Sequence, residues 1–199
     1  MSAAETGDVT ATSSSAGGYI QRGRYRVRQF AQAIRANLAP LSKAERAEVR
    51  GFLPEVAHPL FDAMPSSDQR HGLSVLRALR ARGNDHPALL QAALLHDCAK
   101  HQGGIRLWHR VAIVLVKAFK PSLLAGWAKS APPERSSWRY PFWAHANHAD
   151  MGAALAAEVS CDPMAVRLIR SHQDPPVGIE GDLLAGGLLV ALQAADDDS

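Results

Sequence analysis

A chain of 199 residues, 47% of them hydrophobic, is long enough to form one domain with a sizeable core, and no apolar run approaches the roughly 20 residues of a membrane-spanning helix. The formal net charge of +3 is a mild excess of scattered basic residues, which disfavours a specific nucleic-acid-binding surface. Two cysteines are too few for a disulfide framework, so we expect a reducing, cytoplasmic environment.

The N-terminal part of the chain is expected to lie outside the chemistry. Residues 1–18 are rich in Ser, Thr, Ala and Gly and lack the basic start and apolar centre of a secretory signal, which predicts a disordered tail. Residues 19–65 are expected to form a helical lead-in that packs on the core. Within it, Ser42 and Glu45 have the spacing of a capping box, which predicts a helix that ends by Pro54.

A core domain is expected over residues 66–199, and it begins with a helix. Residues 66–68 are good N-cap residues, and Gly83 is a suitable end for the same helix. His71 lies near the predicted buried stripe of this helix. Taken alone, it would be interpreted as a histidine satisfied by backbone or water.

The apolar run over residues 88–95 predicts a central helix that is buried on nearly all sides, with Pro87 in its first turn. This helix ends in His96-Asp97. Removing an imidazole and a carboxylate from water costs free energy unless a metal or strong hydrogen-bond partners compensate. Histidine and carboxylate are common ligands of divalent cations, so the pair suggests a metal site if further ligands lie on other helices.

The segment after the central helix offers basic side chains. Residues 101–104 are typical of a loop, and residues 105–119 predict another helix. Lys100, Arg106 and Arg110 could converge on an anion, because arginine binds phosphate through two parallel hydrogen bonds and lysine acts as a point charge. For Arg106 and Arg110, an exposed or structural role fits equally well.

Residues 131–137 form the clearest internal loop. The helix that follows is predicted to carry His145, His148 and Gly152 on one face, so that both histidines point the same way.

Two more helices complete the chain. Asp162 is expected to cap a short helix whose apolar face ends at His172. The last helix is predicted from about Asp182, with Asp196 on its apolar stripe.

Six residues, taken in order, resemble the H…HD…H…H…D pattern of the HD-domain superfamily of metal-dependent phosphohydrolases. The family often has LLHDxGK where this chain has Leu94-Leu95-His96-Asp97-Cys98-Ala99-Lys100, and the resemblance covers roughly residues 66–197. Other matching segments are Arg70-His71-Gly72, His148 with Gly152-Ala153, Ile169-Arg170-Ser171-His172 and Leu192-Gln193-Ala194-Ala195-Asp196.

The resemblance implies an all-α HD-domain helical bundle that holds one or two divalent metal ions, with iron, manganese, zinc, cobalt and nickel all compatible. It implies that Asp97 bridges two metals and that Asp97 and Lys100 are catalytic. His145 is the alternative to His148 as a ligand, or a substrate-contacting group. The first metal would be held by His71, His96, Asp97 and Asp196, the second by Asp97, His148 and His172, and the substrate by Lys100, Arg106, Arg110 and His145.

The expected activity is cleavage of a phosphoester by metal-activated water, in a small phosphorylated substrate that is a nucleotide phosphodiester or dinucleoside polyphosphate. One alternative is a mononuclear nucleotidase, in which His148 and His172 only contact the substrate. A noncatalytic nucleotide-sensing module and an oxidative di-iron enzyme also remain open. The sequence does not indicate the oligomeric state.

Overall fold

The computed structural model describes residues 39–104, 130–175 and 182–199 and the isolated positions 116, 119 and 126. Every regular element in these residues is a helix, which confirms the all-α prediction. The chain divides into two compact units, residues 1–39 and 40–199. The predicted tail and the first part of the predicted lead-in lie outside the described residues.

Three short elements lead from residue 43 to the core: α2 (Lys43–Phe52), the 3-10 helix η1 (Glu55–Ala57) and α3 (His58–Asp62). The predicted capping box begins α2. Its Ser42 hydroxyl accepts from the Glu45 amide at 3.2 Å, and the Glu45 carboxylate accepts from the Ser42 amide at 2.8 Å. The helix ends before Pro54, as predicted. Val49 and Phe61 enter the same hydrophobic cluster as the central helix.

The helix α4 (Ser66–Ala81) carries His71, and its start differs from the prediction. Pro65 is the N-cap residue, in an extended conformation, and residues 66–68 form the first turn instead of capping it. The Pro65 carbonyl accepts from the amides of Asp68 and Gln69, so the turn closes without a side-chain cap.

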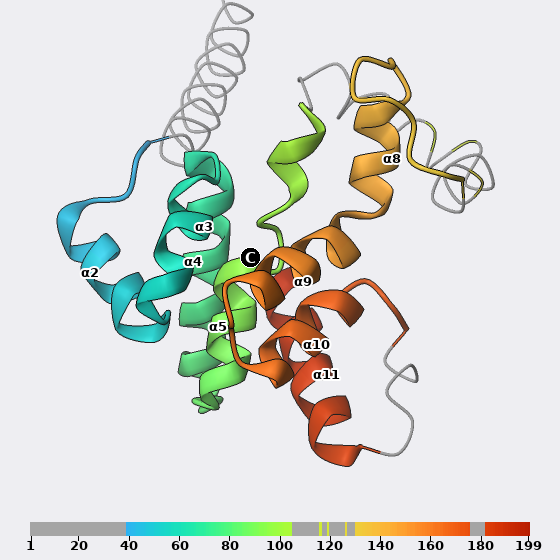
Figure 1. Cartoon of the computed structure of the whole chain (residues 1–199). Coiled ribbons are helices and arrows are strands. Elements are labelled where there is room, and N and C mark those ends of the chain that lie inside the picture. The colour runs from blue at the N-terminus through green and yellow to red at the C-terminus, as the bar shows by residue number, and fades with distance from the viewer. Residues whose placement is uncertain (1–38, 105–115, 117–118, 120–125, 127–129, 176–181) are drawn as a thin grey trace, which may run out of the picture. The chain divides into compact units, whose positions relative to one another are not determined.

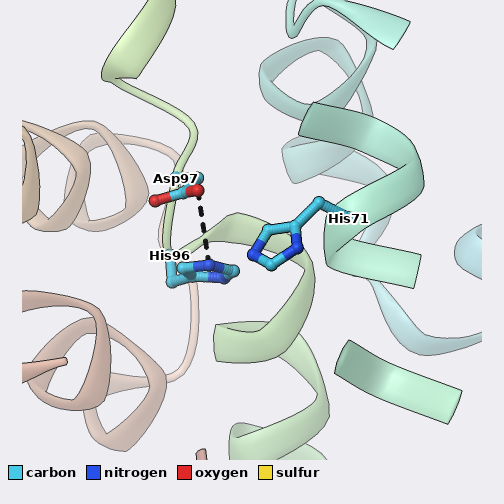
Figure 2. A group of neighbouring side chains, drawn as sticks. All are labelled: His71, His96 and Asp97. Carbon is cyan, nitrogen blue, oxygen red and sulfur yellow. Dashed lines mark ion pairs between the residues drawn. The ribbon is translucent and has the colours of Figure 1, made fainter. Parts of the chain in front are cut away.

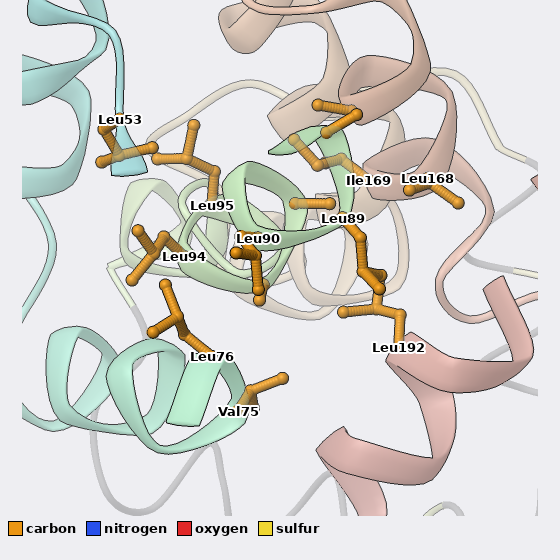
Figure 3. Close-up of a cluster of buried hydrophobic side chains, with 14 of the residues drawn as sticks. Leu53, Val75, Leu76, Leu89, Leu90, Leu94, Leu95, Leu168, Ile169 and Leu192 are labelled. Atoms are coloured by element: carbon orange, nitrogen blue, oxygen red, sulfur yellow. The ribbon is translucent and has the colours of Figure 1, made fainter. Parts of the chain in front are cut away.

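The central helix α5 (Pro87–Leu95) is surrounded by other helices, as its uniform apolarity predicts. Its leucines are at most 2% exposed, and they pack against side chains of α4, α10 and α11 (Figure 3). Burying one leucine contributes roughly 1.5–3 kcal/mol. This burial fixes the end of α5, where His96 and Asp97 lie.

Beyond α5, a short 3-10 helix η2 (Lys100–Gly103) occupies the predicted loop and ends at Gly104, whose φ is +59°. In the part of the chain that the structure describes, four further α-helices follow: α8 (Tyr140–Ala146), α9 (His148–Glu158), α10 (Pro163–Ser171) and α11 (Leu183–Asp197) (Figure 1). Asp162 caps α10 with its side chain, as predicted. The last helix begins near Asp182, as predicted, and the Asp182 side chain caps it. Among the described residues, no helix has the length and apolarity that crossing a membrane requires.

The predicted single helix that carries both His145 and His148 is wrong. Asn147, with φ −111° and ψ 11°, separates α8 from α9. Its backbone amide and its side-chain amide both donate to the Trp143 carbonyl, at 3.0 and 2.9 Å. His145 therefore ends one helix, and His148 begins the next.

Gly72 allows α4 to approach the end of α5 closely. A Cβ atom at this position would lie 3.1 Å from the Leu94 carbonyl oxygen and 3.2 Å from that of Ala93. Both are backbone atoms of the buried helix, so they cannot move aside independently. The missing side chain at Gly72 thus sets the distance between His71 and the His96-Asp97 pair.

We expect Gly72→Ala to destabilise the protein, because overpacking costs about 1–3 kcal/mol and only part is offset by better helix propensity. Gly51→Ala in α2 is the matched control. No atom lies within 4 Å of its added Cβ, so only the propensity gain remains. Thermal unfolding should give a lower midpoint for Gly72→Ala and a slightly higher one for Gly51→Ala. Equal midpoints would contradict the close approach.

Candidate metal centre

The six ligand-type side chains come from five helices and meet beside the end of α5. His71 lies on α4, His96 and Asp97 follow α5, and Figure 2 shows these three side chains together. The side chains form two sets of three residues, and Asp97 belongs to both. Within each set, the three ligand atoms lie within 4.8 Å of one another. The sets are His71, His96 and Asp97, and Asp97, His148 and His172.

Three of the four histidines are held in the same way. His96 and His172 are the C-cap residues of α5 and α10, and His148 follows the end of α8. In each, Nδ1 donates to the carbonyl oxygen three residues earlier, at 3.0, 2.6 and 2.7 Å for His96, His148 and His172. The last carbonyls of a helix lack intrahelical partners, so they are available for this contact. The Nδ1 proton is thereby fixed, and Nε2 keeps its lone pair for a ligand.

The group formed by Asp97, His148 and His172 is compact and buried. His148 Nε2 lies 3.2 Å from His172 Nε2, and Asp97 Oδ1 lies 3.4 and 3.8 Å from these two nitrogens. Metal–ligand bonds of about 2.0–2.2 Å place neighbouring ligand atoms roughly 3–3.5 Å apart. The two shorter distances fit this spacing, and the 3.8 Å between Asp97 Oδ1 and His172 Nε2 is slightly longer. Two imidazole lone pairs that face each other are unfavourable unless a cation or proton lies between them.

The group around His71 is more open. His71 Nε2 donates to Asp196 Oδ1 at 2.7 Å, and their side chains are 29% and 33% exposed. The His96 Nε2 atom lies 3.4 Å from Asp196 Oδ1 and 3.5 Å from Asp97 Oδ2. Asp97 thus turns one oxygen toward His96 and the other toward His148 and His172, which is the arrangement of a shared ligand.

Two buried polar atoms in the centre lack a hydrogen-bond partner in the described part of the chain: His96 Nε2 and Asp97 Oδ1. Leaving such an atom unsatisfied costs about 1–3 kcal/mol, more for a charged group. The donors are imidazole nitrogen and carboxylate oxygen, which suit iron, manganese, zinc, cobalt and nickel. A divalent ion would satisfy both atoms, so the residues present fit a metal.

The protonation states also suit metal ligation. Burial raises the pKa of Asp97, but His96, His148 and Lys100 outweigh it and hold that pKa well below its usual range. Burial and the charge of His96 lower the pKa of His172 to about 4, so its Nε2 is unprotonated at neutral pH. His96 differs, because Asp97 and Asp196 raise its pKa against the effect of burial.

The predicted substrate-binding residues have different positions. Lys100 Nζ lies 2.5 Å from Asp97 Oδ2, and its side chain is 31% exposed, so the ammonium reaches the centre from its open side. His145 belongs to neither set of ligand atoms, and its ring stacks on that of His148 with centroids 5.7 Å apart. The geometry therefore places His148, and not His145, among the candidate ligands. Arg106 and Arg110 lie outside the described residues, and a substrate contact by His145 stays a prediction.

Sequence reasoning missed the backbone carbonyls that orient the three helix-end histidines. Their position could have been found, because a histidine at the C-terminal end of a helix is within reach of an unsatisfied carbonyl. The sequence also left open which nitrogen of each histidine faces the centre, and these contacts assign Nε2 at all three.

Cys98 follows Asp97 directly, so the accessibility of its thiol measures how tightly the chain packs after α5. It is fully buried, with Sγ 3.8 Å from the Gly152 carbonyl oxygen, and burial raises its pKa to about 12. At pH 8 only about one such thiol in ten thousand is ionised. In a Cys161→Ser background we expect iodoacetamide to leave Cys98 unmodified in the native protein and to label it in urea, as measured by mass spectrometry. Rapid native labelling would contradict the buried position.

Comparison of the chain with protein-family models, curated proteins and solved structures found no match. The geometry of the centre is therefore the basis for a functional proposal.

Proposed function

We propose that the chain is a metal-dependent phosphohydrolase of the HD-domain type, acting on a nucleotide phosphodiester or a dinucleoside polyphosphate. The observation that carries the proposal is the position of Asp97 between two histidine groups, with its oxygens directed to different sides. Two ions that share a carboxylate suit the cleavage of a phosphodiester, because charge develops on both the attacking and the leaving oxygen.

Divalent ions held here would lower the pKa of a water molecule and offset the negative charge of a phosphoryl group. The chain itself supplies orientation and charge. The pKa of Asp97 is held well below its usual range, so its carboxylate is ionised, and its side chain is buried. The carbonyls behind His96, His148 and His172 keep these rings from rotating.

Lys100 contributes a partly exposed positive charge in contact with Asp97. Its ammonium contacts Asp97 Oδ2 and is partly exposed, so an anionic group that approaches from solvent meets it beside the ligands. We propose that it stabilises charge on the phosphoryl oxygens during hydrolysis.

The proposal is tested by metal analysis of protein purified without chelator, paired with phosphate or nucleotide release from a substrate panel. The panel contains nucleoside monophosphates, a diadenosine polyphosphate, and the mono- and bis-para-nitrophenyl phosphates. We expect two bound ions and faster cleavage of the diester and polyphosphate substrates. One ion with turnover of monophosphates alone would support the mononuclear nucleotidase. Binding of nucleotides without release would overturn the enzymatic proposal.

A further inference from the structure

A side-chain amide on α11 holds the turn that carries His172. Gln193 Nε2 donates to the His172 carbonyl oxygen at 3.0 Å and to the Asp174 carbonyl oxygen at 2.7 Å. These are contacts across 21 and 19 positions of sequence, from the middle of α11 to the end of α10. One NH₂ group thus uses both of its protons on the same turn.

The turn depends on this amide because it lies at the end of a helix. The final carbonyls of α10 have no partner within the helix, and side chains or water must satisfy them. From a neighbouring helix, Gln193 satisfies the carbonyl of the C-cap residue His172 and that of Asp174, two residues further on. His172 is then held at two points, through its carbonyl by Gln193 and through Nδ1 by the Ile169 carbonyl.

The same helix also carries a ligand-type residue of the other group. Asp196 follows Gln193 by three positions, so the two side chains lie on neighbouring parts of one helix face. Asp196 contacts His71 and His96, whereas Gln193 contacts the His172 turn. As a rigid element, α11 therefore links the backbone position of one group to a side chain of the other.

We propose that Gln193 is a positioning residue for the metal centre, an inference that rests on the proposed metal-dependent function. It holds His172 Nε2 within reach of His148 Nε2 and Asp97 Oδ1, which lie 3.2 and 3.8 Å away. Without the amide, the end of α10 loses two hydrogen bonds, and the ring follows its backbone. Losing an outer contact of this type typically costs about 10–100-fold in metal affinity.

Gln193→Met tests the role because methionine has a similar length and no donor. Gln91→Met is the matched control. Gln91 also ties α10 to another helix, through a hydrogen bond from the Asp162 amide at 3.4 Å, but at the end remote from His172. Gln193→Lys restores a donor to the two carbonyls and serves as the rescue variant.

The probe is Co²⁺, titrated into metal-free protein and followed by its visible absorption and by competition with a chelator. We expect wild type, Gln91→Met and Gln193→Lys to bind with similar affinity. Gln193→Met should lose about 10–100-fold for one ion and show a changed spectrum. Thermal unfolding of the metal-free variants measures any general destabilisation. If the role of Gln193 were purely structural, Gln193→Met would lower the unfolding midpoint without changing the Co²⁺ spectrum.

Unchanged Co²⁺ affinity and spectrum in Gln193→Met, or an equal loss in Gln91→Met, would overturn the positioning role and leave the phosphohydrolase proposal standing. Wild-type protein that binds no Co²⁺ would overturn both.

Discussion

Asp97→Asn is expected to remove the bound metal and to lower hydrolysis at least about a thousandfold, because one neutral amide replaces the carboxylate that both histidine groups share. The substitution keeps the shape of the side chain while removing its charge. Metal content by mass spectrometry and release of product from the preferred substrate are the measurements. Circular dichroism verifies that the variant is folded.

Asp150→Asn is the matched control for this experiment. Asp150 lies on α9, is 72% exposed and pairs with Arg170 at 3.5 Å, away from the ligand atoms. We expect it to keep both metal and activity. If Asp97→Asn also retained its metal and its rate, the shared-ligand arrangement would be refuted.

Lys100→Ala should keep the metal and lower kcat by about 10²–10³-fold, because it removes a positive charge that acts on the transferred phosphoryl group. The structure places Nζ against Asp97 Oδ2 and leaves the side chain partly exposed, so the metal ligands themselves are unchanged. Steady-state kinetics and metal content are compared with those of Lys43→Ala, an exposed lysine of α2.

The two outcomes that oppose this prediction have different meanings. Unchanged kinetics would exclude Lys100 from the reaction. Loss of the metal together with activity would assign Lys100 to holding Asp97 instead of acting on the substrate.

The sequence predicts the helices well where one residue type dictates a boundary. Pro87 begins α5, and Asp162 and Asp182 cap α10 and α11, because proline and aspartate satisfy the first turn locally. The apolar run of α5 also reveals its burial, since a helix without a polar face has no side to turn to water.

The break at Asn147 is harder to predict, because apolar spacing alone continues through it. Two histidines three residues apart would share a face in one continuous helix. At Asn147, whose side chain bonds the Trp143 carbonyl, α8 ends instead, so His145 and His148 lie on different helices although their rings still stack. Periodicity gives the face of a helix, but a specific hydrogen bond decides where the helix stops.

The sequence indicates which residues form the candidate site, but it does not indicate which atom of each residue faces the centre. Order along the chain indicates the six ligand-type side chains, and the structure brings them together around Asp97. The direction of each ring depends on contacts between distant segments or with backbone carbonyls, and a one-dimensional pattern does not contain them. For the same reason, the contact of Gln193 with the α10 turn has no sequence signature.

The anchoring of three rings on terminal carbonyls has a dynamic consequence. Final helical turns are the parts of a protein that open first in hydrogen exchange, at a free energy far below that of global unfolding. At His96, His148 and His172 such a fluctuation would release the imidazole from its support. Retention of a cation bound here would thus be governed by the local resistance of these helix ends to fraying, which can change while the melting temperature of the whole domain stays constant.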